Sequence, residues 1–381
     1  MMRKKPSPSA APVPDSAVHG ARLVIKLDAI AANYRRIAAL AAPAQASAVV
    51  KADAYGLGLA PVALRLAKAG CRTFFVAHYA EGVALRALLP QARIYILHGL
   101  PENMAELYLA SRLQPVLNTL EEIALWRESN AGLASGAILN FDIGMTRLGL
   151  SRRDAGRLSG EPALLEGIRI DYLMAHLSCA DEPDHPLNAR QLAAFNQIRE
   201  LFPGVPASLA NTAGVLLGPQ YCFDLIRPGI GLYGGSPVIG GKSAFENVVV
   251  LTARILQVQE VDSGDYVGYG ATYRVEGPAR IAVAGIGYAD GYMRAMGNSG
   301  AGAIGEYKVP CVGVVSMDLC TFDVTHLPAG LCRPGGEIEL IGPNATLAQA
   351  AQAAHTIDYE LLTRLGGRFT RSYTGEGGSH I

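Results

Sequence analysis

The sequence predicts a parallel (β/α)8 barrel of the TIM type, followed by a mostly β C-terminal domain. Short β-rich runs alternate with helical stretches eight times, and after about Gly235 the pattern changes to alternating strands with turn residues between them. The chain has 381 residues, enough for two domains with large cores. A doubly wound open sheet gives a similar alternation of strands and helices, so it stays open as an alternative.

The barrel elements follow one another along the first part of the chain. The expected strands are Ser47–Val50, Thr73–Ala77, Arg93–Leu97, Pro115–Asn118, Gly136–Phe141, Ile170–His176, Ala207–Ala210 and Leu225–Arg227. Between them, apolar residues at three- and four-residue spacing predict helices, for example Leu59–Ala69, Ala80–Leu89, Leu120–Ser129 and Ala189–Leu201. Leu23–Leu27 precedes the barrel, and we expect that it can pair with it.

The second domain is expected to be built from short strands: Val248–Gln259, Arg280–Ile286, Val309–Val315, Thr321–Val324 and Glu337–Ile341. The predicted organisation is a flexible arm at residues 1–20, the barrel at 21–235 and the β domain at 236–381. The arm begins with basic residues, but prolines interrupt it where a signal peptide needs an apolar run. We therefore interpret it as an arm and not as a leader.

Composition excludes several classes of function. The 33 basic and 33 acidic side chains cancel, so the chain lacks the overall positive field that binds nucleic acid. No apolar run approaches the roughly 20 residues needed to cross a bilayer. The six cysteines are scattered, without the spacing of a metal site, and are expected to be reduced thiols. These features predict a cytoplasmic protein without a metal, membrane or nucleic-acid partner.

A lysine stands at the end of the first predicted barrel strand, in Ala48-Val-Val-Lys-Ala-Asp-Ala-Tyr-Gly-Leu-Gly58. Strand ends at this face of a barrel point into the active site. Apolar neighbours would lower the pKa of Lys51, and an uncharged amine can form a Schiff base. The alternative is a lysine that reaches the surface or pairs with Asp53.

The string around Lys51 resembles the pyridoxal-phosphate attachment signature of the alanine racemase family, and matching pieces follow in order nearly to Tyr373. The resemblance implies that Lys51 holds pyridoxal 5'-phosphate as a Schiff base (aldimine) and serves as one catalytic base. Phe141-Asp-Ile-Gly-Met-Thr-Arg-Leu-Gly149 resembles the family segment whose arginine, here Arg147, contacts the cofactor and the substrate side of the site, and by the same resemblance His176 would pack on the pyridine ring.

The resemblance also implies how the cofactor's phosphate and ring nitrogen are held. The expected phosphate cradle, with its flanking residues, consists of Tyr55, Asn211, Thr212, Gly229, Ile230 and Tyr359. Glycine lets backbone N–H groups approach an anion, and late loops of these barrels often bind phosphate. Arg227 would contact the ring nitrogen. An arginine accepts no hydrogen bond and is always charged, so the nitrogen should stay unprotonated, which favours fast reprotonation over transamination.

The second base is expected in the β domain, in Tyr266-Val-Gly-Tyr-Gly-Ala-Thr-Tyr273, where Tyr269 matches the family's catalytic tyrosine. Positive charge on Arg147 and His176 is expected to bring its phenol toward neutrality. In the family this tyrosine comes from the partner subunit, so the resemblance implies a head-to-tail homodimer with shared active sites.

Three further matches surround the expected substrate. The backbone at Met317, in Val315-Ser-Met-Asp318, would bind the substrate carboxylate. Tyr288, in Ile286-Gly-Tyr-Ala-Asp-Gly291, and Arg294 would line the entrance.

Two positions depart from the family pattern. Asn140 stands where many members carry a carbamylated lysine whose negative charge fixes the arginine equivalent to Arg147, so a halide could fill the gap. Leu57 stands where the signature often has histidine. Members of broad specificity also carry asparagine at the first position.

The predicted function is therefore interconversion of L-alanine and D-alanine by two bases. The alternatives are a broad-specificity amino-acid racemase or a serine racemase. A pyridoxal-phosphate decarboxylase of related architecture is opposed by Arg227. A cofactor-binding homeostasis protein would lack the second domain.

Overall fold

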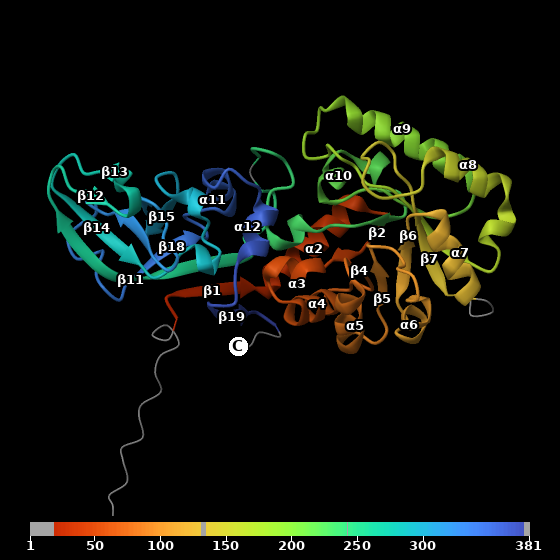
Figure 1. Ribbon diagram of the computed structural model, residues 1–381, viewed down its shortest axis with the longest axis horizontal. Helices are drawn as coiled ribbons and strands as arrows, with labels where there is room; N and C mark the ends of the chain where they lie inside the picture. Colours follow the sequence, from red (N-terminus) through yellow and green to blue (C-terminus); the bar gives the residue numbers. More distant parts are fainter. Residues whose placement is uncertain (1–18, 131–134, 242, 377–381) are drawn as a thin grey trace, which may run out of the picture. The chain divides into compact units, whose positions relative to one another are not determined.

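The computed structural model describes residues 19–130, 135–241 and 243–376, and it divides the chain into two compact units (Figure 1). Among the described residues, the barrel unit comprises Lys26–Val248 and residues 373–376. The β unit comprises the described residues up to Ile25 and Val249–Ser372.

The barrel unit is a ring of short parallel strands. Its strands are Gln45–Ala46 (β2), Ala48–Val49 (β3), Thr73–Val76 (β4), Arg93–Ile96 (β5), Gln114–Leu117 (β6), Gly136–Asn140 (β7), Arg169–Met174 (β8), Ala207–Ser208 (β9) and Leu225–Ile226 (β10). Strands β3 to β9 form one parallel sheet in chain order, and β10 pairs in parallel with β2.

Backbone hydrogen bonds of β10 close the ring. On one side, Asp224 N donates to Ala207 O at 3.0 Å, next to β9. On the other side, Ser47 N donates to Ile226 O at 3.0 Å, between β2 and β3. A sheet whose last strand joins its first has no open edge. The predicted barrel is confirmed, and the open doubly wound sheet is excluded.

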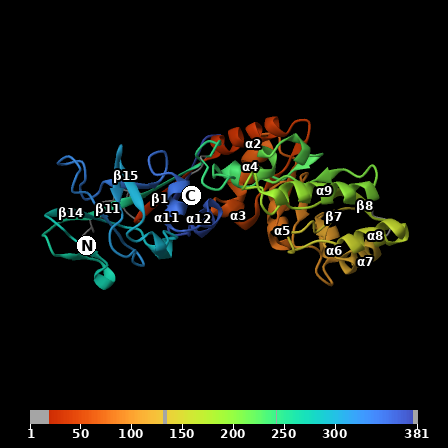
Figure 2. The same cartoon turned by 90° about the horizontal axis from the view of Figure 1, so that it is seen from above.

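Helices lie outside the strands (Figures 1 and 2). They are Leu27–Ala41 (α2), Lys51–Gly56 (α3), Leu59–Lys68 (α4), Tyr79–Leu88 (α5), Ala105–Ala110 (α6), Leu120–Ser129 (α7), Arg152–Gly160 (α8), Pro186–Leu201 (α9) and Thr212–Leu216 (α10), with 3-10 turns at Pro162–Leu165 (η1), Pro219–Tyr221 (η2) and Ile230–Tyr233 (η3). All four residues of β4 are buried, as expected for a strand packed on both faces. Within the described part of the chain, each helix is too short or too polar to cross a membrane.

The β unit is organised around one long strand, β11. Its strands are Ala21–Lys26 (β1), Val249–Val261 (β11), Tyr266–Val267 (β12), Tyr273–Arg274 (β13), Ala279–Ala284 (β14), Ala301–Ile304 (β15), Tyr307–Pro310 (β16), Cys320–Asp323 (β17), Glu337–Ile341 (β18) and Thr370–Thr374 (β19). Its helical segments are Tyr269–Ala271 (η4), Tyr288–Asp290 (η5), Arg294–Met296 (η6), Leu347–Ala353 (α11) and Asp358–Arg364 (α12). The main sheet runs β16-β15-β18-β11-β1-β19, with β14 pairing β11 and β17. The expected mostly β domain is confirmed.

The expectation for the first strand was wrong. Instead of pairing with the barrel, β1 runs antiparallel to β11, with Ala21 opposite Ala253, so residues up to Ile25 belong to the β unit. The physical reason is visible in its alternation: Leu23 and Ile25 are buried, whereas Arg22 is exposed. Such alternation is typical of a sheet with one solvent-facing side, not of a barrel strand.

The expected arm at residues 1–20 lies almost entirely outside the described residues. Gly20 is described, and its carbonyl accepts a hydrogen bond from Arg254 N at 2.8 Å.

Candidate active site

Lys51 lies just beyond the carboxyl end of β3, as the first residue of α3, and not on the strand itself. The following residues 52–55 have φ between +53° and +57°, so α3 is a left-handed turn although none of the four is glycine. This conformation costs about 1–2 kcal/mol per non-glycine residue. Strain of this kind persists only where the surroundings enforce it, and it concentrates at functional sites.

Two carboxylates hold the turn. Asp53 Oδ1 accepts a hydrogen bond from Leu59 N at 2.6 Å, which ties the turn to the start of α4. Glu81, from the first turn of α5, accepts a hydrogen bond from Ala52 N at 2.7 Å. The lysine is therefore presented from a fixed backbone.

The environment of Lys51 favours its uncharged form. Burial is the main cause that lowers the pKa of its amine, and the guanidinium of Arg147 lowers it further. The carboxylate of Glu81 acts in the opposite direction. A lysine with a lowered pKa is a better nucleophile at neutral pH than an exposed one.

Arg227 is buried next to this site and donates to neutral groups. Its acceptors are Ser208 Oγ at 2.5 Å, Ala175 O at 2.7 Å and Leu209 O at 3.3 Å. Burial lowers the pKa of Arg227 to about 9, so the guanidinium stays charged at neutral pH. The site therefore contains a fixed cation that can donate to a ligand but cannot accept a proton from it.

His176 is neutral. Its Nδ1 lies 3.5 Å from Arg227 Nη2. Part of the ring surface remains accessible, but protein surrounds the rest, and burial lowers the pKa of His176 to about 3, with Arg227 as the next cause. The expectation that a positive charge on His176 helps Tyr269 to ionise was therefore wrong. A neutral flat ring suits stacking on a pyridine ring.

A cradle for an anion lies at the start of η3 and α10. Thr212 Oγ1 accepts hydrogen bonds from Gly229 N at 3.1 Å and Gly231 N at 3.4 Å. Asn211 Oδ1 caps α10 through Gly214 N at 2.8 Å. Ile230 N–H, the first of η3, has no hydrogen-bond partner among the described residues.

Gly229 is needed because a tyrosine lies against it. A Cβ at this position would be 2.3 Å from the hydroxyl oxygen of Tyr55. Tyr55 is fixed by stacking on the buried Tyr233, with ring centroids 4.6 Å apart. The hydroxyls of Tyr55 and Thr212 therefore lie close to the backbone of Gly229 and Ile230. These donors fit the phosphate of pyridoxal phosphate, in a space that a side chain at residue 229 would fill.

Arg147 is exposed on a loop whose backbone is hydrogen-bonded to the side chains of Asp142 and Asn140. Asp142 Oδ1 accepts hydrogen bonds from Gly144 N and Met145 N, both at 2.9 Å. Asn140 Nδ2 donates to Asn118 Oδ1 at 2.9 Å and to Leu148 O at 3.3 Å. Asn140 thus supports the loop by a hydrogen bond to its backbone. A negatively charged group at this position would instead attract the side chain of Arg147.

The remaining predicted site residues belong to the β unit. Tyr269, on the turn between β12 and β13, is 71% exposed. Met317 O accepts a hydrogen bond from Ala289 N at 3.0 Å, which joins its loop to the Tyr288 segment. Met317 N–H has no hydrogen-bond partner among the described residues, as a donor to a substrate carboxylate requires. Arg294 is exposed on η6, and Tyr359 lies on α12.

The sequence did not predict four residues that shape the site. Asn118 supports Asn140, Ser208 supports Arg227, and Tyr233 supports Tyr55. Glu81, the fourth, holds Ala52. Of these four residues, only Glu81 could have been recognised from the sequence. It stands in the first turn of a helix, directly after a buried strand, where acidic residues cap backbone N–H groups.

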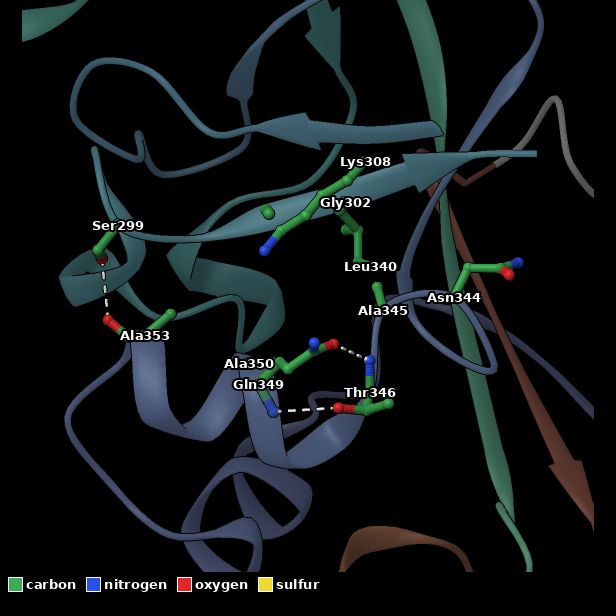
Figure 3. A pocket seen from close by; sticks show the side chains of 11 residues that line it. Ser299, Gly302, Lys308, Leu340, Asn344, Ala345, Thr346, Gln349, Ala350 and Ala353 are labelled. Atoms are coloured by element: carbon green, nitrogen blue, oxygen red, sulfur yellow. Dashed lines mark hydrogen bonds between the residues drawn. The ribbon is translucent and has the colours of Figure 1, made fainter. Parts of the chain in front are cut away.

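A separate pocket lies in the β unit (Figure 3). Ser299, Lys308, Thr346 and Gln349 are among its lining residues. Reciprocal hydrogen bonds between Thr346 and Gln349 begin α11 there. None of the predicted site residues lines this pocket.

Comparison with known proteins matches both units. The N-terminal domain of alanine racemase matches residues 25–237, and the C-terminal domain matches residues 248–373. The chain belongs to the alanine racemase family. The C-terminal match also removes the homeostasis protein from consideration, since such a protein would lack this domain.

Relatives and solved structures agree with the family. The chain is 47% identical over 359 residues to the alanine racemase of Rhodospirillum rubrum, covering 93% of this chain and 96% of the relative. It is 45% identical over 370 residues to that of Brucella abortus, covering 93% of each. The crystal structure of the Bartonella henselae alanine racemase, with covalently bound pyridoxal phosphate, superposes with a TM-score of 0.89 at 38% identity, covering 93% of this chain and 99% of the other. The biosynthetic alanine racemase of Pseudomonas aeruginosa superposes with a TM-score of 0.89 at 34% identity, covering 94% of this chain and 100% of the other.

Proposed function

We propose that this member of the alanine racemase family interconverts L-alanine and D-alanine by a two-base mechanism, with Lys51 as one base and Tyr269 as the other. The enzyme is an isomerase that depends on pyridoxal phosphate. One observation carries the proposal. At the carboxyl end of the barrel strands, a lysine with a lowered pKa begins a strained turn, near an anion cradle.

The barrel unit would hold the cofactor through its own side chains. Thr212, Tyr55 and the N–H of Ile230 would bind the phosphate, with Asn211 fixing the start of α10. Tyr359 is also proposed as a phosphate ligand. His176 would stack on the ring, and Arg227 would donate to its nitrogen. When bound, the group supplies an electron sink that makes the substrate's α-hydrogen acidic.

The two bases would hold and move the proton on opposite faces of the substrate. Lys51 Nζ serves one face and Tyr269 Oη the other. Arg147 would orient the substrate side of the site, and Met317 N–H would donate to the substrate carboxylate. Tyr288 and Arg294 would line the entrance.

A head-to-tail homodimer is part of the proposal. Tyr269 and Met317 are 71% and 54% exposed in a single chain, and a base in open water gains no preorganisation. Tyr266, Tyr288 and Ile357 are further large apolar side chains of the β unit left exposed. Exposed aromatic residues and methionine are typical of interfaces. A second barrel would cover them and complete both sites.

Alanine is the proposed substrate, and a small amino acid is what the family name of the relatives indicates. Asn140 supports the alternative of a broad-specificity amino-acid or serine racemase, because the amide carries no charge to fix Arg147. A decarboxylase is disfavoured because Arg227 is no acidic partner for a ring nitrogen.

A halide near Asn140 also belongs to the proposal. The Asn140 amide already donates to Asn118 and Leu148, so Arg147 would have to supply the positive charge that binds the ion. Replacing chloride by gluconate should then lower activity. Equal activity in both salts would remove the halide.

We place the protein in the cytoplasm. All six cysteines are free thiols in the structure, and five of them are buried. Unpaired thiols suit a reducing compartment.

The function is tested by chiral separation of products after incubation of the cofactor-loaded protein with L-alanine, L-serine, L-lysine and L-arginine in separate reactions. Rapid formation of D-alanine with little other product supports an alanine racemase. Comparable turnover of larger substrates would make it a broad-specificity racemase, and no D-product from any substrate would overturn the proposal.

A further inference from the structure

The Glu81 carboxylate joins two neighbouring strand ends of the barrel. Its Oε2 accepts hydrogen bonds from Ala77 N at 2.7 Å and His78 N at 3.2 Å, directly after β4. Its Oε1 accepts the hydrogen bond from Ala52 N at 2.7 Å, directly after Lys51. One side chain therefore begins its own helix and also holds the first peptide of the left-handed turn.

This peptide contains the carbonyl group of Lys51, so it is part of the backbone from which the lysine side chain extends. Further along the turn, Ala54 N donates to Val50 O at 3.0 Å, and Asp53 accepts from Leu59 N. The peptide between Lys51 and Ala52 is held by Glu81, from another helix. Because residues 52–55 are left-handed and not glycine, the turn has no intrinsic preference for this conformation.

We infer that Glu81 is a positioning residue, whose carboxylate keeps the left-handed turn in place and thereby directs the Lys51 amine into the site. The inference rests on the proposed role of Lys51. It adds a residue whose effect passes through the backbone of the lysine and not through contact with cofactor or substrate.

The same carboxylate also acts on the charge of Lys51. The charged or titratable groups that interact with the amine are Arg147, Glu81, His98 and His176. Of these, only Glu81 is acidic, and it raises the pKa of Lys51 against the effects of burial and Arg147. Removal of its charge should lower that pKa further.

Glu122 provides a matched control. It occupies the first turn of α7, and its Oε2 accepts a hydrogen bond from Asn118 N at 2.7 Å. A backbone hydrogen bond from Leu100 also stabilises its carboxylate. Glu122 thus joins two strand ends in the same way, but no lysine lies on the segment that it holds.

The test compares Glu81→Gln with Glu122→Gln in the cofactor-free protein. Glutamine keeps one acceptor oxygen, which can serve Ala77 and His78, and leaves an NH2 group facing Ala52 N–H. We expect hydrogen–deuterium exchange of the amides of residues 51–57 to become about tenfold faster in Glu81→Gln. Glu122→Gln should leave this segment unchanged.

Two further measurements separate positioning from simple stability. The pH midpoint for labelling Lys51 with an amine-reactive reagent should shift downward in Glu81→Gln and not in Glu122→Gln. At saturating pyridoxal phosphate, kcat should fall about tenfold in Glu81→Gln, which is about 1.4 kcal/mol in the barrier, and stay within about twofold in Glu122→Gln.

Unchanged exchange of residues 51–57 together with an unchanged labelling midpoint would overturn the inference, whatever the activity. If Glu81→Gln does not fold, Glu81→Asp is measured, which keeps the charge and both acceptors on a side chain shorter by one methylene. Faster exchange of the same segment is expected there, and unchanged exchange contradicts the inference. A wild-type protein without racemase activity would refute the proposed function but leave the exchange result readable.

Discussion

Arg227 Nη2 lies 3.5 Å from Nδ1 of His176, so a permanent cation stands beside a ring that remains neutral. Burial is the first cause of the lowered pKa of His176, and Arg227 is the second. The pair gives the barrel a donor for a ring nitrogen and a flat neutral surface for the ring itself.

The lowered pKa of His176 predicts a stability effect in acid. Between its ordinary value of 6.5 and the folded value of about 3, the unfolded chain binds a proton that the folded chain does not. Stability should therefore fall as the pH drops through this window, by up to about 1.4 kcal/mol per pH unit. Urea unfolding of the cofactor-free protein at pH 7.5 and 5.0 measures the loss, and His176→Asn should reduce it. His326→Gln is the control for removal of an exposed imidazole. An equal loss in wild type and His176→Asn contradicts the assignment.

Gly229→Ala should weaken cofactor binding. The new Cβ would lie 2.3 Å from the Tyr55 hydroxyl, so the tyrosine or the cradle must move. Equilibrium dialysis with pyridoxal phosphate should give an affinity reduced at least tenfold, about 1.4 kcal/mol. Gly156→Ala is the control, because a Cβ there meets open space on α8. Equal affinity in the Gly229 variant would show that the cradle does not hold the phosphate.

Arg227→Met should destabilise the barrel. It removes the donors for the carbonyl groups of Ala175 and Leu209, and each buried acceptor left without a donor costs about 1–3 kcal/mol. We expect a loss of roughly 2–4 kcal/mol in urea unfolding of the cofactor-free protein. Arg190→Met, at an exposed position of α9, should change stability by less than about 0.5 kcal/mol. If the two variants unfold alike, the network around Arg227 contributes little.

Tyr269→Phe should remove one base without affecting the fold. The side chain is exposed, so loss of its hydroxyl should leave stability and cofactor affinity unchanged. Racemisation should fall by orders of magnitude in both directions, with α-hydrogen exchange lost mainly on one face. Exchange into deuterated water, followed for each enantiomer, measures this. Unchanged turnover would mean that another group is the second base.

The sequence predicted the fold because its signals are local. Apolar runs such as Thr73–Val76 and Gly136–Asn140 alternate with amphipathic helices, and this pattern predicts the barrel that the pairing of β10 with β2 confirms. The first strand pairs with the β unit and not with the barrel. In the sequence its run Leu23-Val-Ile25 is continuously apolar, like a barrel strand, and its alternating burial appears only in the structure.

The site was only partly predictable, for a physical reason. Motif residues such as Lys51 and Gly229 are recognised by residue type and order. Three other features arise from contacts between segments far apart in the sequence. They are the left-handed conformation of residues 52–55, the neutral state of His176 and the hydrogen bond from Ala52 N to Glu81. The structure brings the barrel residues together, and their catalytic roles stay predictions.

The central claim is that Lys51 of one chain and Tyr269 of its partner form one active site. Mixing inactive Lys51→Ala with inactive Tyr269→Phe, under conditions that exchange subunits, tests it most directly. In a mixed dimer one site would then combine an intact lysine with an intact tyrosine, and activity should recover to about a quarter of the wild-type value, since half of the dimers carry one good site. No recovery, with subunit exchange verified by native mass spectrometry, would contradict the shared two-base site.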